Sequence, residues 1–122
     1  MDERRTLRVS EAVREELAEI ITFEMEDPRL VDVAVSEVHV SPDSRHATVK
    51  VVTRGDQHTQ NQALAALAHA SGYLRRELAF RLQLRHVPEL HFEREKNPDA
   101  DSRIDFLLRR AKKSRPRDEK QP

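Results

Sequence analysis

Four arginines lie close together in the second half of the sequence: Arg75, Arg76, Arg81 and Arg85. An arginine guanidinium is a rigid fork that can hold a phosphate group through two hydrogen bonds. On a helix, Arg81 and Arg85 share a face because residues four apart are neighbours. We therefore predict that this arginine cluster contacts phosphate. The alternative for each arginine is an ion pair with Glu77 or Glu89.

Other basic residues extend this charge along the chain. Arg45 and Lys50 lie on or beside a predicted hairpin and would widen the basic surface. A basic run near the C-terminus can order on RNA as a flexible tail, and its candidate contacts are Lys112, Lys113 and Arg115. Acids are concentrated in residues 11–32, although 22 basic and 22 acidic residues balance overall. This asymmetry indicates an anionic partner for the basic part. The alternative is a polar protein with solvated helix faces.

Six histidines offer nitrogen ligands or general bases: His39, His46, His58, His69, His86 and His91. None has HExxH spacing, and no carboxylate completes a metal motif along the sequence. His39 and His91 are expected to face away from the apolar sides of their strands. Spacing places no Ser-His-Asp set and no glycine-rich phosphate loop. We therefore expect no metal, no cofactor, no small-molecule substrate and no catalytic residues.

Length and composition favour a single intracellular domain. The 122 residues can bury a core without disulfides or metal. There are no cysteines, which excludes disulfides and thiolate metal sites and fits a reducing cytosol. The N-terminal stretch MDERRTLRVS is charged where a signal peptide is apolar, and no stretch approaches the roughly 18 apolar residues of a membrane span. We expect a cytoplasmic protein without a membrane partner.

Hydrophobic periodicity predicts an α+β domain of order α-β-β-α-α-β. Helices are expected over 7–25, 59–70, 73–84 and 102–110, and strands over 31–40, 46–53 and 89–93. Valine alternation slips near Ser36-Glu37, which indicates a bulge. The three-stranded sheet should carry the helices on one face, with 31–40 in the centre as its longest and most apolar strand. The domain would cover 1–110 with a short C-terminal helix, and 111–122 would be a disordered charged tail.

The stretch Ala70-Ser71-Gly72 interrupts an otherwise helical pattern. We expect a kink there between two helices, with Gly72 in the left-handed conformation that glycine adopts at little cost. Aromatic residues for stacking on bases are scarce. Tyr73 is the sole tyrosine, and the four phenylalanines are expected in the core: Phe23, Phe80, Phe92 and Phe106. For a nucleic-acid partner, contacts to its backbone and shape are therefore favoured over base reading.

The element order resembles a type II KH domain, which usually carries GxxG between its paired helices to clamp a nucleic-acid backbone. This chain has only two glycines, so GxxG is absent and Ala-Ser-Gly stands in its place. That substitution resembles the ribosome-binding factor A family. The matching strings are DPRL (27–30), VSPDSRHATVKV (40–51), ASGYLRREL (70–78), LRHVPELHF (84–92) and RIDFLL (103–108). The resemblance covers about residues 9–108.

The resemblance implies a bacterial assembly factor rather than an enzyme. Such a factor binds the free 30S ribosomal subunit and assists late maturation of 16S rRNA, including processing of its 5′ end, especially in the cold. It is expected to contact rRNA near the decoding region and neck, to leave before translation, and to be a monomer off the ribosome. Two alternatives remain: a KH-like protein–protein interaction module without direct RNA binding, and a hydrolase or nuclease with an unrecognised site.

Overall fold

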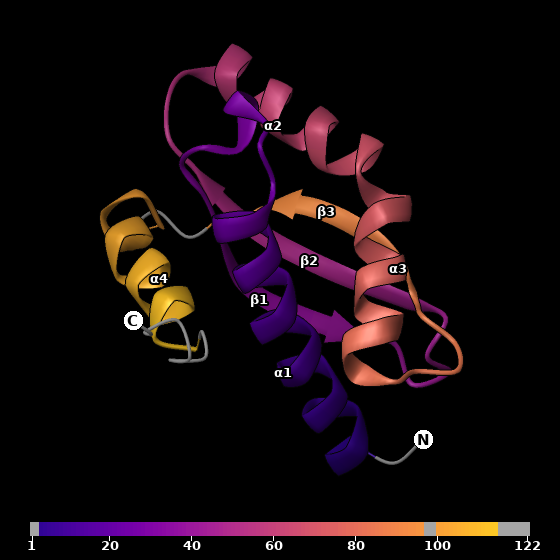
Figure 1. The fold of residues 1–122 in the computed structure, drawn as a ribbon. Helices are drawn as coiled ribbons and strands as arrows, with labels where there is room; N and C mark the ends of the chain where they lie inside the picture. Colours follow the sequence, from indigo (N-terminus) through magenta and orange to yellow (C-terminus); the bar gives the residue numbers. More distant parts are fainter. Residues whose placement is uncertain (1–2, 97–99, 115–122) are drawn as a thin grey trace, which may run out of the picture.

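The structure, a computed structural model, describes residues 3–96 and 100–114. In chain order the elements are α1 (Glu3–Glu19), the π turn η1 (Ile20–Glu24), the 3-10 turn η2 (Pro28–Leu30), β1 (Val33–Val40), β2 (His46–Thr53), α2 (Gln57–His69), α3 (Ser71–Leu82), β3 (Glu89–Arg94) and α4 (Ala100–Ser114). This confirms the α+β class and the expected order (Figure 1). Among these residues, no helix has the length and apolar content that a membrane crossing requires.

The sheet has the order β1-β2-β3, so β2 is central and the expectation that residues 31–40 form the central strand is wrong. β1 and β2 pair antiparallel, and β2 and β3 pair parallel. The register shift between Val35 and Glu37 confirms the bulge. β1 is apolar although it is an edge strand, because Val33 and Val35 enter the main core while Ala34 is buried beneath α4. Because both faces of β1 are partly buried, its sequence has the apolar pattern of a central strand although it lies at the edge of the sheet.

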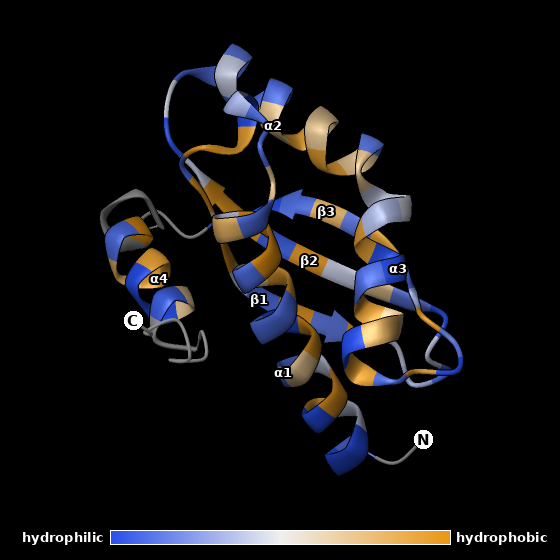
Figure 2. Cartoon of the chain, viewed as in Figure 1, coloured by the Kyte–Doolittle hydropathy of each residue, from blue (hydrophilic) through white to orange (hydrophobic). Residues whose placement is uncertain are grey.

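The main core lies between one face of the sheet and the helices α1, α2 and α3 (Figure 1). Alternating residues of β2, including Val49 and Val51, point into it and are fully buried. Leu17 of α1 and the pair Leu74 and Leu78 of α3 face them. Hydrophobic and hydrophilic residues alternate along α1 (Figure 2), and those that enter the main core include Val13, Leu17 and Ala18. This confirms the expected packing of three helices on one face.

Helix α4 packs at the β1 edge and covers part of the other face of the sheet. Its Ile104 and Leu107 form a small second core with Ala34 and Val52. Nearby, Arg54 Nη2 lies 2.6 Å from a carboxylate oxygen of Asp105. The sequence had not indicated helical packing on this face. α4 also continues to Ser114, so residues 111–114 of the expected tail are helical, and residues 115–122 lie outside the described part.

A single residue separates α2 from α3. Ala70 follows α2 and precedes α3 with φ −86° and ψ 1°, a negative φ that does not require glycine. Gly72 lies inside α3 and is not among the residues with positive φ, so the expected left-handed conformation is wrong. That conformation instead ends α3, at Gln83 with φ 53°. The chain changes direction at Ala70 without needing a glycine there.

Candidate nucleic-acid interface

The outer side of α3 presents Tyr73, Arg76 and Phe80, which we call the α3 ridge. Their spacing of three and four residues places them on one side of the helix. Phe80 is 82% exposed, so its expected place in the core is wrong. The buried stripe of α3 is Leu74 and Leu78. Phe80 lies two positions beyond Leu78, roughly 200° around the helix, and therefore points to solvent.

The other three phenylalanines also differ in how far they are exposed. Phe106 is 52% exposed, because the neighbours that α4 buries are Ile104 and Leu107. This also corrects its expected place in the core. Phe23 is half-buried, and Phe92 is half-buried against the main core. Only α3 thus combines an almost fully exposed phenylalanine with arginine among the described residues.

Arg76 is the arginine of the cluster best placed to meet a ligand. Its side chain is exposed, and within residues 3–96 and 100–114 it makes no hydrogen bond or ion pair. Its Nη1 lies 3.6 Å from the position that a Cβ on Gly72 would occupy. The guanidinium therefore lies back over the small surface of Gly72. It can offer its full set of donors to a phosphate.

Arg75 has a different role, although it is the neighbour of Arg76. It is half-buried, and its Nη2 donates a hydrogen bond of 2.8 Å to the carbonyl oxygen of Val87. Its Nε is buried without a hydrogen-bond partner among the described residues. This contact ties α3 to the loop that leads into β3. We therefore assign Arg75 to holding the loop, and not to the expected phosphate contact.

Arg81 is surrounded by carboxylates and cannot serve as the expected free phosphate contact. Its guanidinium forms ion pairs with Glu77 at 3.3 Å, Glu19 at 3.4 Å and Glu16 at 3.5 Å, and also with Glu24. The hydrogen bond with Glu24 is the main cause that raises the pKa of Arg81. The side chain is only 20% exposed. Arg81 links α3 to α1 and η1, and the alternative of pairing with Glu77 is present.

The remaining basic candidates do not form one continuous surface. Arg85 is exposed in the loop after α3. Arg45 is exposed just before β2, and its carbonyl accepts the Glu89 N–H at 2.8 Å. Lys50 pairs in register with Glu93, on the sheet face away from α1, α2 and α3. Lys112 is exposed on α4. The side chain of Lys113 and all of Arg115 lie outside the described residues.

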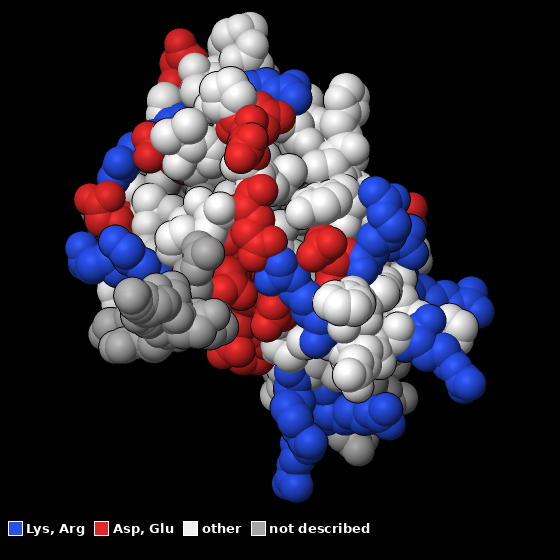
Figure 3. All heavy atoms as spheres, viewed as in Figure 1, with Lys and Arg blue, Asp and Glu red and all other residues white. Residues whose placement is uncertain are grey.

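Two arginines that the sequence reasoning missed stand at the start of α1. Arg4 and Arg8 are exposed and one helical turn apart. Figure 3 shows basic side chains gathered at the lower right, around α3 and the N-terminal end of α1, with acids down the middle of the molecule. The spacing of Arg4 and Arg8 was a usable signal. These two arginines directly precede the acid-rich residues 11–32, which dominate the charge of this part of the sequence.

With this geometry in place, comparison with known proteins decides the family. Residues 5–108 match ribosome-binding factor A. The chain belongs to the ribosome-binding factor A family. A ribosome-binding factor A of Solibacter usitatus is 72% identical over 119 residues, which cover 98% of this chain and 97% of that protein. The sequence resemblance is thereby confirmed at nearly full length.

Solved structures of ribosome-binding factor A have the same fold. The crystal structure of the Thermus thermophilus protein is 31% identical, covers 73% of this chain and 94% of that one, and gives a TM-score of 0.66. A homology model of Thermus thermophilus ribosome-binding factor A, fitted into a cryo-EM map of a 30S–RbfA complex, is 32% identical with a TM-score of 0.61. It covers 72% of this chain and 92% of that chain.

On this chain, charge and aromatic surface coincide on α3. The Arg76 guanidinium is exposed with its donors available, and Phe80 exposes its aromatic ring one turn further along α3. Arg85 and Arg8 add exposed positive charge on neighbouring elements. Arg75 and Arg81 stabilise the elements that carry these groups. The acidic residues of α1 repel an anion, so they restrict the directions from which an anionic ligand can approach α3.

Proposed function

We propose that this chain binds the free 30S ribosomal subunit and assists the late maturation of 16S rRNA, including processing of its 5′ end. Membership of the ribosome-binding factor A family supports this. The observation that carries it is the fitted complex of a Thermus relative with 30S, a relative that shares this fold. The protein would act in the cytoplasm as a monomer, without a cofactor and without catalysing a reaction, and would matter most in the cold.

The α3 ridge and the arginines beside it are the surface that we assign to rRNA. Arg76 would hold a backbone phosphate, with Arg85 and Arg8 adding charge around it. Phe80 would stack on an unpaired base or pack against a sugar, a contact typical of single-stranded RNA. Lys50, on the far face of the sheet, would not take part in this contact. The rRNA would then be held by one side of the molecule.

Co-sedimentation tests the proposed function directly. The purified full chain is centrifuged with separated 30S subunits, 50S subunits and 70S ribosomes at low and moderate salt. Selective pelleting with free 30S subunits is expected. A folded protein that pellets with none of the particles, or equally with all of them, would contradict the proposal.

Matched variants test the surface. Arg76→Glu and Phe80→Ala should each weaken binding to 30S by about tenfold or more, because each removes a contact worth roughly 1–3 kcal/mol. Arg94→Glu at the opposite end of β3 and Phe106→Ala on α4 are the controls, since both residues are exposed but lie outside the α3 ridge. Equal losses in all four variants would remove α3 from the interface.

A protein–protein interaction module remains the second candidate, because the exposed Tyr73 and Phe80 share one side of α3 and aromatic side chains are common at protein interfaces. Salt dependence separates the two. If rRNA phosphates are bound, affinity should fall steeply with salt, and Arg76→Glu should reduce that slope by about one. Binding to a ribosomal protein through Phe80 would leave the slope shallow and unaffected by Arg76→Glu.

A further inference from the structure

Three side chains with metal-binding atoms meet on the exposed face of the sheet. His46 opens β2, and Glu89 and His91 lie on β3. His46 pairs in register with Glu89, and His91 lies two residues further along the same strand. Because strand side chains alternate, all three point away from the core that contains Ala47 and Leu90. All three are exposed.

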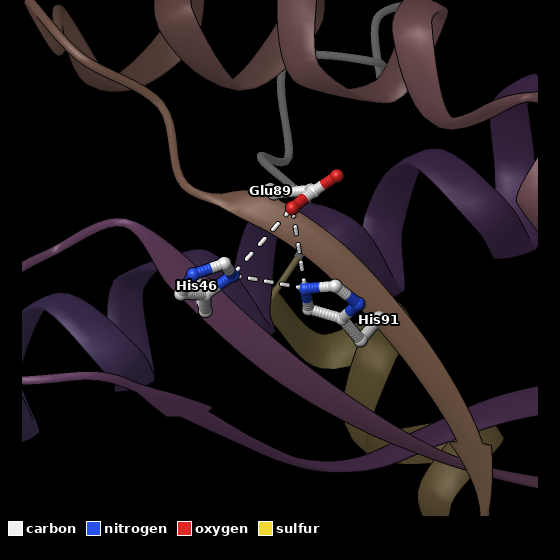
Figure 4. Close-up of side chains that lie close together, drawn as sticks. All are labelled: His46, Glu89 and His91. Carbon is white, nitrogen blue, oxygen red and sulfur yellow. Dashed lines mark hydrogen bonds and ion pairs between the residues drawn. The ribbon is translucent and has the colours of Figure 1, made fainter.

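The three candidate ligand atoms form a compact triangle (Figure 4). His46 Nδ1 lies 3.1 Å from His91 Nε2, His46 Nδ1 lies 3.5 Å from Glu89 Oε1, and His91 Nε2 lies 3.6 Å from that same oxygen. Tetrahedral zinc with bonds of 2.0–2.2 Å separates its ligands by about 3.3–3.6 Å. The observed spacing therefore fits three corners of such a site with little movement of the side chains.

The backbone fixes these positions before any ion arrives. The His46 N–H donates to Ser41 Oγ at 3.1 Å, and the Ser41 N–H donates to the His46 carbonyl at 2.7 Å. The Glu89 N–H donates to the Arg45 carbonyl at 2.8 Å. The hairpin turn and the parallel pairing of β2 with β3 thus hold the ligands together. Only side-chain rotation remains to be restricted on binding, which favours affinity.

We propose that His46, Glu89 and His91 form a binding site for a borderline divalent transition metal of the zinc type. Two imidazoles and one carboxylate are a ligand set that zinc accepts, whereas calcium and magnesium prefer oxygen ligands throughout. The protein supplies three ligands, and exposure to solvent leaves the fourth position to water. This inference does not depend on ribosome binding.

The sequence-based expectation of no metal site relied on spacing along the chain. His46 and His91 are 45 residues apart, which no short motif can express. The register between β2 and β3 brings them together. A hydrogen bond between the two rings is the competing explanation of the triangle, because one neutral ring can donate to the other. The two explanations differ in which ring nitrogens carry protons.

Tautomers therefore provide the decisive signature. A metal bound to His46 Nδ1 and His91 Nε2 leaves the proton of His46 on Nε2 and that of His91 on Nδ1. A hydrogen bond between the same two nitrogens requires one of them to keep its proton. Two-dimensional 15N–1H spectra of the imidazole rings distinguish these states directly.

The experiment titrates chelator-treated full-length protein with Zn²⁺, followed by histidine NMR and calorimetry. We expect saturable binding of one zinc ion, with His46 and His91 changing together to the stated tautomers. His46→Ala, His91→Ala and Glu89→Gln should each lower the zinc affinity by about tenfold or more. Mutating residues that only hydrogen-bond to a metal ligand already costs that much. Zinc should raise the thermal midpoint of the unmodified protein and should raise it less in these three variants.

His39→Ala is the matched control. His39 is exposed on the same sheet face, across Thr48 from His91, but its only carboxylate partner among the described residues is Glu37 at 3.3 Å. The His39→Ala variant should bind zinc as tightly as the unmodified protein. Absence of saturable binding would overturn the proposal. So would an affinity that survives both His46→Ala and His91→Ala, or one that His39→Ala reduces equally. Circular dichroism checks that each variant is folded.

Discussion

The guanidinium of Arg75 lies 2.8 Å from the carbonyl oxygen of Val87, and this hydrogen bond joins the middle of α3 to the loop before β3. Its neighbour Arg76 points outward and makes no such contact within the described chain. The sequence predicts the same role for these two adjacent arginines, but the structure gives them different surroundings. One positions the loop that carries Arg85, and the other is available to a ligand.

Replacing Arg75 should therefore cost stability. Arg75→Met keeps most of the aliphatic stem but leaves the Val87 carbonyl without its donor. We expect the free energy of unfolding to fall by about 1–3 kcal/mol, as for other buried groups that lose a charged partner. Urea denaturation measures this, with Arg76→Met as the matched control. A larger loss for Arg76→Met than for Arg75→Met would reverse the assignment of the two side chains.

Arg81 should be more important for folding than for binding. It faces four carboxylates of α1, η1 and α3, and its removal leaves them close together without the cation that they share. We expect Arg81→Met to lower the free energy of unfolding by about 1–3 kcal/mol, between the values for exposed and buried pairs. High salt should reduce the difference from the unmodified protein. Arg85→Met, a change of the same kind at an exposed loop position, should be neutral; equal effects would contradict an ion-pair network.

Hydrophobic spacing was sufficient to predict the element order because each element has one clear apolar side. The α1 stripe of Val13 and Leu17 and the β2 stripe of Val49 and Val51 are both fully buried as expected. Spacing could not give the strand order, because α4 buries Ala34 on the second face of β1. Edge and central strands look alike when a distant helix covers the edge.

The candidate site was harder to predict than the fold. Charge patterns located the arginines, but only tertiary packing shows that Arg81 meets Glu16 and Glu19 from a helix more than 60 residues away. Residue type predicts a buried Phe80, but its position on the helix, two residues after the buried Leu78, places it on the opposite side, toward solvent. The zinc-type triangle depends on strand register, which apolar alternation does not determine.

Acid should weaken the fold through the pair of Glu11 and Arg14. Arg14 is buried, and its Nη2 lies 2.7 Å from Glu11, whose pKa is lowered mainly by this hydrogen bond. A carboxyl with a lowered folded-state pKa adds stability above its unfolded pKa and loses it as pH falls through the folded value. The stability difference between the protein and Glu11→Gln should therefore be full at neutral pH and shrink below about pH 4.

Thermal unfolding from neutral pH to strongly acidic pH measures this difference. The effect should be modest, because the Glu11 side chain is about half exposed and solvent screens the pair. Glu15→Gln is the matched control, since its carboxylate lies 3.9 Å from the same guanidinium. It should change the midpoint less. A difference for Glu11→Gln that stays constant across the whole pH range would rule out this contribution.

The two glycines should respond in opposite directions to the same substitution. Gly72 is helical, and a Cβ there would meet only Arg76 Nη1 at an ordinary 3.6 Å. Gly72→Ala should raise the free energy of unfolding by up to about 1 kcal/mol, because alanine loses less backbone entropy. Gly55 has φ +102°, and a Cβ would lie 3.0 Å from Thr59 Cβ. Gly55→Ala should lower stability, since both the backbone and the contact are strained.

Urea denaturation of both variants checks the pair, and binding to 30S subunits adds a second measurement on Gly72→Ala. Because the alanine methyl would lie under the Arg76 guanidinium, it can shift that side chain without unfolding the helix. A stabilised Gly72→Ala that binds normally would show that Arg76 has freedom to adjust. A destabilised Gly72→Ala would contradict the helical conformation and return Gly72 to the left-handed kink that the sequence suggested.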